Sequence, residues 1–138
     1  MQRVEFTVPG EPVPAARPRV VRIHGKTIAY TPVKSAKWKE NVAIFAKKAM
    51  LGKQKLQGPL SVTIRFDMPI PKSWTIRKKN QAINQPHTAK PDIDNLVKNA
   101  LDALNGIVFE DDKKVTKLNV MKIFNPEPLT ILNIEEMK

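Results

Sequence analysis

The sequence contains no cysteine, which excludes disulfide bonds, a thiol nucleophile and cysteine-ligated zinc or iron–sulfur sites. It also lacks any apolar stretch near the roughly 20 residues that a membrane span needs. The N-terminal residues do not contain the apolar core of a signal peptide. We therefore expect a soluble, intracellular, cytoplasmic protein with no membrane partner. The length of 138 residues predicts a single domain covering residues 1–138.

Acidic residues are scarce in the first two thirds of the chain. Lysine and arginine total 24 against 13 aspartate and glutamate residues, for a formal net charge of +11. Residues 1–90 carry +14, whereas residues 91–138 carry −3. A basic surface attracts nucleic acids by neutralising their phosphates, but the acidic segment repels the same partner unless a cation lies between them. A solvated basic surface that serves only solubility is the alternative.

The hydrophobic pattern predicts an α/β (α+β) domain, in which a mixed, largely antiparallel sheet is packed by two main helices. Strands are predicted where apolar residues alternate with polar ones, as expected of a sheet with one buried face. The predicted strands are residues 4–8, 60–66, 115–124 and 129–134.

Turn-forming residues divide the remaining chain. A hairpin is expected where residues 20–24 and 27–30 flank Gly25-Lys26. Four prolines predict that residues 9–19 form an extended loop. Further prolines and several lysines predict an irregular basic segment at residues 68–91.

Two helices are expected from the pattern of apolar residues. The first covers residues 35–51, with Thr31 as its N-cap and Pro32 at its first helical position. The second covers residues 93–105. The side chains that we expect to be buried on the first helix are Trp38, Val42, Ile44, Phe45 and Met50.

Six of the 13 acidic residues lie between positions 92 and 112. Within the second predicted helix, the spacing of four residues places Asp94, Lys98 and Asp102 on one stripe beside an apolar face. Asp92 lies at the entry to this helix. Asp111-Asp112 follows a short apolar stretch, residues 107–109, which we expect to return the chain beside the start of the helix.

Convergence of Asp92, Asp94 and Asp112 predicts a metal site. Two ionised carboxylates 4 Å apart repel each other by about 4 kcal/mol at an effective dielectric constant of 20. Either one carboxylate takes a proton or a hard divalent cation binds. Oxygen ligands favour Mg²⁺, with Mn²⁺ as a substitute, over zinc. Such a cation activates water for attack on phosphorus, and Lys98 would neutralise the charge that develops there.

Simpler interpretations exist for each of these residues. Asp92 and Asp94 are suited to helix capping and to interaction with the helix dipole. The Asp111-Asp112 pair is suited to a polar turn. Lys98 is suited to an ion pair with an aspartate four residues away.

Other motifs give no further chemistry. The tripeptide Gly25-Lys26-Thr27 resembles the end of a phosphate-binding loop, but Val20 occupies the position of the first glycine. We therefore expect no nucleotide cofactor. Trp74 lies in the basic segment, where it either stacks on a base or anchors the segment. The residues that charge and loop placement suggest as phosphate contacts are Arg17, Arg19, Lys72, Arg77, Lys78 and Lys79.

Several segments together resemble the RusA family of Holliday junction resolvases. The most specific are residues 90–98 (KPDIDNLVK), 102–106 (DALNG) and 110–115 (EDDKKV). Residues 10–14 (GEPVP), 17–19 (RPR) and 30–32 (YTP) extend the resemblance over nearly the whole chain. The resemblance implies a RusA-like fold and a Mg²⁺-dependent crossover junction endodeoxyribonuclease, a type often encoded by phages and prophages. It also implies a homodimer that makes paired nicks across a four-way DNA junction in recombination and repair.

The resemblance also implies roles for individual residues. Metal ligands carry over to Asp92, Asp94 and Asp112, with Asp111 as the alternative to Asp112. The catalytic lysine of the family matches Lys98. Residues 69–89 are longer than the corresponding segment of compact family members. Two other functions stay open from the sequence: a non-catalytic nucleic-acid-binding protein, and a carboxylate-metal nuclease that acts on flaps or RNA.

Overall fold

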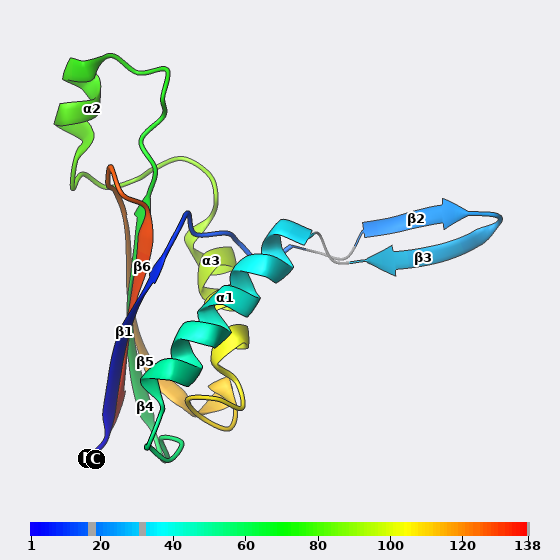
Figure 1. Ribbon diagram of the computed structural model, residues 1–138, viewed down its shortest axis with the longest axis vertical. Coiled ribbons are helices and arrows are strands. Elements are labelled where there is room, and N and C mark those ends of the chain that lie inside the picture. Colours follow the sequence, from blue (N-terminus) through cyan, green and yellow to red (C-terminus); the bar gives the residue numbers. More distant parts are fainter. Residues whose placement is uncertain (17–18, 31–32, 138) are drawn as a thin grey trace.

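The structure is a computed structural model that describes residues 1–16, 19–30 and 33–137. Its centre is a four-stranded sheet in the order β1-β6-β4-β5 (Figure 1). Strand β6 pairs antiparallel with both β1 and β4, whereas β4 and β5 are parallel. The predicted mixed, largely antiparallel sheet is therefore confirmed. The strands are β1 (Arg3–Pro9), β4 (Leu60–Met68), β5 (Val115–Phe124) and β6 (Leu129–Glu136).

Two helices, α1 (Val33–Ala49) and α3 (Ile93–Leu104), cover one face of this sheet (Figure 1). Alternation along β4 directs Leu60, Val62 and Ile64 into the core beneath them, where all three are buried. The expected packing of the sheet by two main helices is confirmed. In the described part of the chain, no helix is both long and apolar enough to span a bilayer.

Helix α1 buries Trp38, Val42 and Met50, as predicted, but the prediction was wrong for Ile44, which is 44% exposed. The buried stripe runs through Trp38, Val42 and Ala46 at intervals of four residues. Ile44 lies two residues from Val42, about 200° around the helix, and therefore faces solvent. Phe45 is partly buried against the core. The predicted capping residues, Thr31 and Pro32, lie outside the described residues.

Helix α3 has one strongly apolar face, on which Leu96, Ala100 and Leu104 are fully buried. The helix ends at Leu104, and Gly106 then adopts a positive φ of 77°. Glycine is suited to this position because it carries no Cβ. The amides of Ile107 and Val108 donate back to the carbonyl of Leu104, both at 3.0 Å. This turn directs the chain into a short 3₁₀ helix, η1 (Asp112–Lys114), and then into β5.

The segment at residues 68–91 was predicted to be irregular, but it contains a helix, α2 (Ile76–Ala82). Thr75 caps this helix, since its hydroxyl accepts a hydrogen bond from the Lys78 amide at 3.2 Å. Residues 72–85 contain no proline, and arginine, lysine, glutamine and alanine favour helix. Helix α2 has seven residues and ends before Asn84, which has a positive φ of 65°. Seven residues are too few for its periodicity to be recognised.

The predicted hairpin is confirmed as β2 (Arg19–Ile23) and β3 (Lys26–Tyr30), which pair antiparallel. Its turn lies at His24-Gly25, one residue before the predicted position. Both turn residues have positive φ, 49° and 77°, as a two-residue turn between twisted strands requires. The hairpin extends away from the four-stranded sheet and its helices (Figure 1).

Candidate active site

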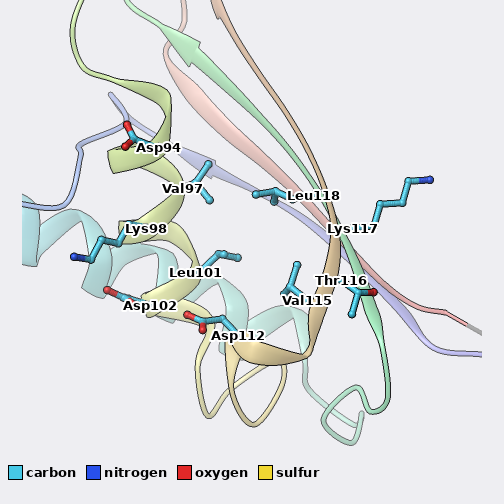
Figure 2. A pocket seen from close by; sticks show the side chains of 10 residues that line it. All are labelled: Asp94, Val97, Lys98, Leu101, Asp102, Asp112, Val115, Thr116, Lys117 and Leu118. Carbon is cyan, nitrogen blue, oxygen red and sulfur yellow. The ribbon is translucent and has the colours of Figure 1, made fainter.

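An open pocket of about 430 Å³ lies between α3 and the first half of β5 (Figure 2). Figure 2 shows Val97 and Leu101 of α3 facing Val115 and Leu118 of β5, so the floor of the pocket is apolar. Three carboxylates and Lys98 lie around this floor, whereas Figure 2 shows the Lys117 side chain pointing away from α3. We call this pocket the α3–β5 groove, and its polar lining residues are Asp94, Lys98, Asp102, Asp112, Thr116 and Lys117.

Helix α3 supplies three of these polar side chains. Asp94, Lys98 and Asp102 follow one another at intervals of four residues, opposite to the buried face that holds the helix on the sheet. Lys98 and Asp102 also border a second depression that lies next to α1. In the described part of the chain, Lys98 forms no ion pair with either aspartate within 4.0 Å. The simple pairing interpretation of Lys98 is therefore not supported.

Asp111 and Asp112 differ in environment although they are adjacent. Asp111 is exposed, and its Oδ1 accepts a hydrogen bond from the Lys113 amide at 2.8 Å, which caps η1. Asp112 is half-buried and lines the groove. Its Oδ2 accepts a hydrogen bond of 3.4 Å from Asn105 Nδ2 at the end of α3. This geometry favours Asp112 over Asp111 as a candidate ligand.

Asp92 lies outside the α3–β5 groove. It occupies the N-cap position of α3, yet its side chain makes no capping hydrogen bond. It lines a neighbouring pocket of about 740 Å³ together with Asp94. Asp94 therefore lies between the two pockets. The structure brings Asp94 and Asp112 to one groove and places Asp92 beside it.

The donor set fits a hard divalent cation in its chemistry, because every candidate ligand is a carboxylate. Across residues 1–16, 19–30 and 33–137, no group of three or more histidine, cysteine, aspartate or glutamate side chains is placed to hold a metal ion. Mg²⁺ is usually bound by one or two carboxylates together with water and substrate phosphates, so a complete protein cage is not required. Asp94 and Asp112 both line the groove, and Figure 2 shows them towards its two ends, with Asp102 on the side of Asp112.

The segment before Asp92 is attached to β5 by Lys122, a residue that the sequence analysis did not single out. Lys122 Nζ donates to the carbonyls of Ala89 at 2.6 Å and Pro91 at 2.7 Å. The His87 amide donates to the Lys122 carbonyl at 2.9 Å. Burial, and secondly the charge of Lys122, lower the pKa of His87 below its ordinary value of 6.5. Both ends of α3 are thus linked to the η1–β5 segment, through Lys122 at one end and Asn105 at the other.

The predicted phosphate contacts that the structure describes are not among the residues that line the α3–β5 groove. Lys72, Arg77 and Lys78 are exposed on or near α2, and Lys79 is half-buried. Trp74 is anchored, since its ring lies 5.4 Å from that of Phe124 and Lys78 Nζ lies 4.0 Å from its centroid. This packing favours the anchoring interpretation of Trp74 over base stacking. Arg17 lies outside the described residues, and Arg19 begins β2.

Comparison with known proteins identifies the class to which this fold and site belong. Residues 9–135 match the family model described as endodeoxyribonuclease RusA. The chain is also 37% identical over 142 residues to the uncharacterized protein YqaN of Bacillus subtilis (strain 168), with 99% of each chain covered. The chain therefore belongs to the RusA family of endodeoxyribonucleases, as its motifs predicted. Membership implies Holliday junction resolvase nuclease activity and a general dependence on divalent metal ions.

Proposed function

We propose that this protein is a Mg²⁺-dependent endonuclease that resolves Holliday junctions by paired, symmetric nicks in DNA recombination and repair. Residues 1–138 form one endonuclease domain in this proposal. The observation that carries it is the placement of Asp94, Lys98 and Asp112 on one groove of a chain with a net charge of +11. The basic surface holds DNA phosphates, and the acidic groove requires a cation before a phosphate enters it.

Asp94 and Asp112, with Asp92 beside them, hold Mg²⁺, for which Mn²⁺ is a substitute. The bound cation supplies Lewis-acid polarisation of the scissile phosphate. The Lys98 ammonium group neutralises the charge that develops on the phosphate oxygens.

DNA phosphates contact basic side chains that extend the binding surface away from the groove. Arg17 and Arg19 lie at or before the start of the hairpin, and the exposed positions on and around α2 support a second contact region. Each neutralised phosphate releases counterions, which increases affinity at low salt. The proposed contacts are Arg17, Arg19, Lys72, Arg77, Lys78 and Lys79.

Paired nicks require two active sites, which a homodimer supplies. Strand β5 lies at the edge of the four-stranded sheet, and residues 84–87 bond to its last three residues. The part of this edge before Lys122 is where a second copy can pair. Met121, which does not line the groove, is 54% exposed there. We propose that β5 of a second copy covers this edge, which places the two α3–β5 grooves near the two-fold axis.

Cleavage of a labelled four-way junction tests the proposed activity. The protein is incubated with the junction or a matched linear duplex, in Mg²⁺ or in EDTA, beside the variants Asp94→Asn and Glu110→Gln. We expect paired nicks in the junction alone, only with Mg²⁺. Asp94→Asn should reduce the rate by at least about 100-fold, since even the outer partners of metal ligands contribute 10–100-fold. Glu110→Gln removes a nearby exposed charge and should cleave normally.

Other results would assign a different function. Junction binding without cleavage, unchanged by EDTA, would identify a non-catalytic DNA-binding protein. Metal-dependent cleavage of flaps or RNA in place of junctions, in a panel of labelled substrates, would identify a different carboxylate-metal nuclease. Equal rates for Asp94→Asn and the wild type would show that the groove is not the active site.

A further inference from the structure

The β2–β3 hairpin forms a separate two-stranded sheet, and its strands pair mainly with each other. Figure 1 shows it extending from the side of the molecule that carries α1, well clear of the core. An isolated two-stranded hairpin is at best marginally stable and buries little apolar surface. The hairpin therefore contributes little to the folded core, and its tip is open to a partner.

The positive charge of the hairpin region indicates which kind of partner it binds. Between Glu11 and Glu40 the sequence has no acidic residue, but it has seven lysines and arginines. At the tip, Arg22, His24 and Lys26 are exposed. Among the described residues, no salt bridge within 4.0 Å involves Arg22 or Lys26. Cations that the chain itself does not neutralise attract a polyanion.

The dimensions of the hairpin fit a DNA groove. Ile23 pairs with Lys26 and Arg22 with Thr27, so the two tip cations lie in the first two residue pairs beside the turn. Strands of five residues reach roughly 17 Å. The major groove of B-DNA is about 12 Å wide and 8.5 Å deep and admits a two-stranded β-ribbon. Ile23, 47% exposed at the tip, supplies an apolar side chain for thymine methyl groups on the groove floor.

We infer that the β2–β3 hairpin is an arm that enters the major groove of one duplex branch of the substrate, where Arg22 and Lys26 contact phosphates. The choice of branched DNA rests on the proposed function. A second copy of the chain is a poorer occupant, because it also carries a net charge of +11 and repels the cationic tip. When one branch of a junction lies in the α3–β5 groove, another branch is available to the arm. A linear duplex in the groove has no second branch, so the arm favours branched substrates.

Binding measurements on the full-length protein test this role. The variant Arg22→Gln/Lys26→Gln removes the two tip cations. The control Lys47→Gln/Lys48→Gln removes the same charge from exposed positions on α1. Fluorescence anisotropy with a labelled four-way junction and a linear duplex is recorded in EDTA, which prevents cleavage. The salt concentration is varied from about 50 to 200 mM.

We expect the tip variant to bind the junction roughly tenfold more weakly at the lower salt. The slope of log K against log salt should fall by roughly 1.8, because each lost phosphate contact contributes about 0.9. The loss should be larger for the junction than for the linear duplex. The control should change neither quantity, and the melting temperature of the tip variant should stay within about 2 °C of the wild type, because the hairpin lies outside the core.

The outcomes separate this inference from the proposed function. Junction cleavage by the wild type, with an unchanged salt slope in the tip variant, overturns the role of the arm and leaves the proposed function intact. Dissociation of a wild-type dimer by the tip substitutions, measured by sedimentation, also overturns it, because the hairpin would then be a subunit contact. If the wild type binds DNA but cleaves no junction, weaker duplex binding by the tip variant still supports the arm.

Discussion

The acidic groove and the basic extensions of this molecule are built in different ways. The groove residues lie on α3, in η1 and at the start of β5. Helix α3 packs on the central sheet through fully buried side chains such as Leu96 and Leu104, and β5 is one strand of that sheet. The basic residues on the hairpin and α2 lie on segments that project from that sheet (Figure 1). Chemistry at one phosphorus requires ligands held to a fraction of an ångström, whereas phosphate contacts tolerate movement. The difference predicts that substitutions in the two regions affect separate quantities.

The largest effect on the cleavage rate is expected from substitution of Asp112. Substitution of its neighbour Asp111 should change the rate little. Asp112→Asn should lower the junction cleavage rate by at least about 100-fold, because the groove loses a candidate metal ligand. Asp111→Asn should change it by less than about threefold, since the new amide oxygen still accepts the Lys113 hydrogen bond. Single-turnover rates in Mg²⁺ measure both. Equal losses in the two variants would contradict the assignment of Asp112.

A smaller effect is expected at Lys122, which supports the groove from outside it. Lys122→Met removes both hydrogen bonds to the segment before Asp92 and should lower the cleavage rate roughly tenfold, as loss of outer partners of a metal site does. The Mg²⁺ concentration for half-maximal rate should rise, whereas junction binding in EDTA should not change. Lys122→Arg, which keeps the donors, should restore most of the activity. A loss of DNA affinity that matches the loss of rate would show that Lys122 contacts DNA instead.

Substitutions on α2 should affect affinity without affecting the chemical step. Arg77→Gln/Lys78→Gln/Lys79→Gln should weaken junction binding several-fold and reduce the salt slope by about 0.9 for each lost phosphate contact. The single-turnover rate at saturating protein should match that of the wild type. Salt titrations by anisotropy, paired with rate measurements, check both statements. An unchanged slope would remove α2 from the DNA-binding surface.

The smallest effect is the pH dependence of stability due to His87. Its pKa is lowered by burial and by Lys122, so the folded state binds fewer protons than the unfolded state below about pH 6.5. This contribution to stability is present above pH 6.5 and is lost as the pH falls through the lowered pKa. Urea unfolding at pH 7 and pH 5 should show a smaller decrease for His87→Gln than for the wild type. An NMR titration of the His87 ring with a midpoint at or above 6.5 would contradict burial and the Lys122 charge as the dominant influences on this ring.

Local patterns in the sequence predicted the parts of the molecule that local forces determine. The helical stripe of Asp94, Lys98 and Asp102 follows from a period of 3.6 residues, and the return of the chain to Asp112 follows from the turn at Gly106. The alternation of apolar and polar residues likewise predicted the strands of the main sheet. The convergence of Asp92 with these residues stays a prediction, because Asp92 is not among the residues that line the groove.

Contacts between distant segments were not predictable from these patterns. Lys122 bonds to carbonyls more than 30 residues away, and no local signal marks it. Asp67, on which the sequence analysis made no prediction, is fully buried. It accepts hydrogen bonds from Arg65 at 2.8 and 2.9 Å and from Asn125 at 2.9 Å. Tertiary packing therefore decides these positions.

The position of β6 in the sheet has a consequence for synthesis of the enzyme. This strand follows all the other described elements in the chain, yet it lies between β1 and β4 and pairs with both. Before β6 leaves the ribosome, β1 has no partner strand in the main sheet, and the sheet that supports the groove is incomplete. The aspartates are already present in such a nascent chain, but they are not yet held in place. The sheet that supports the groove is therefore complete only after β6 has been synthesised and has paired with β1 and β4.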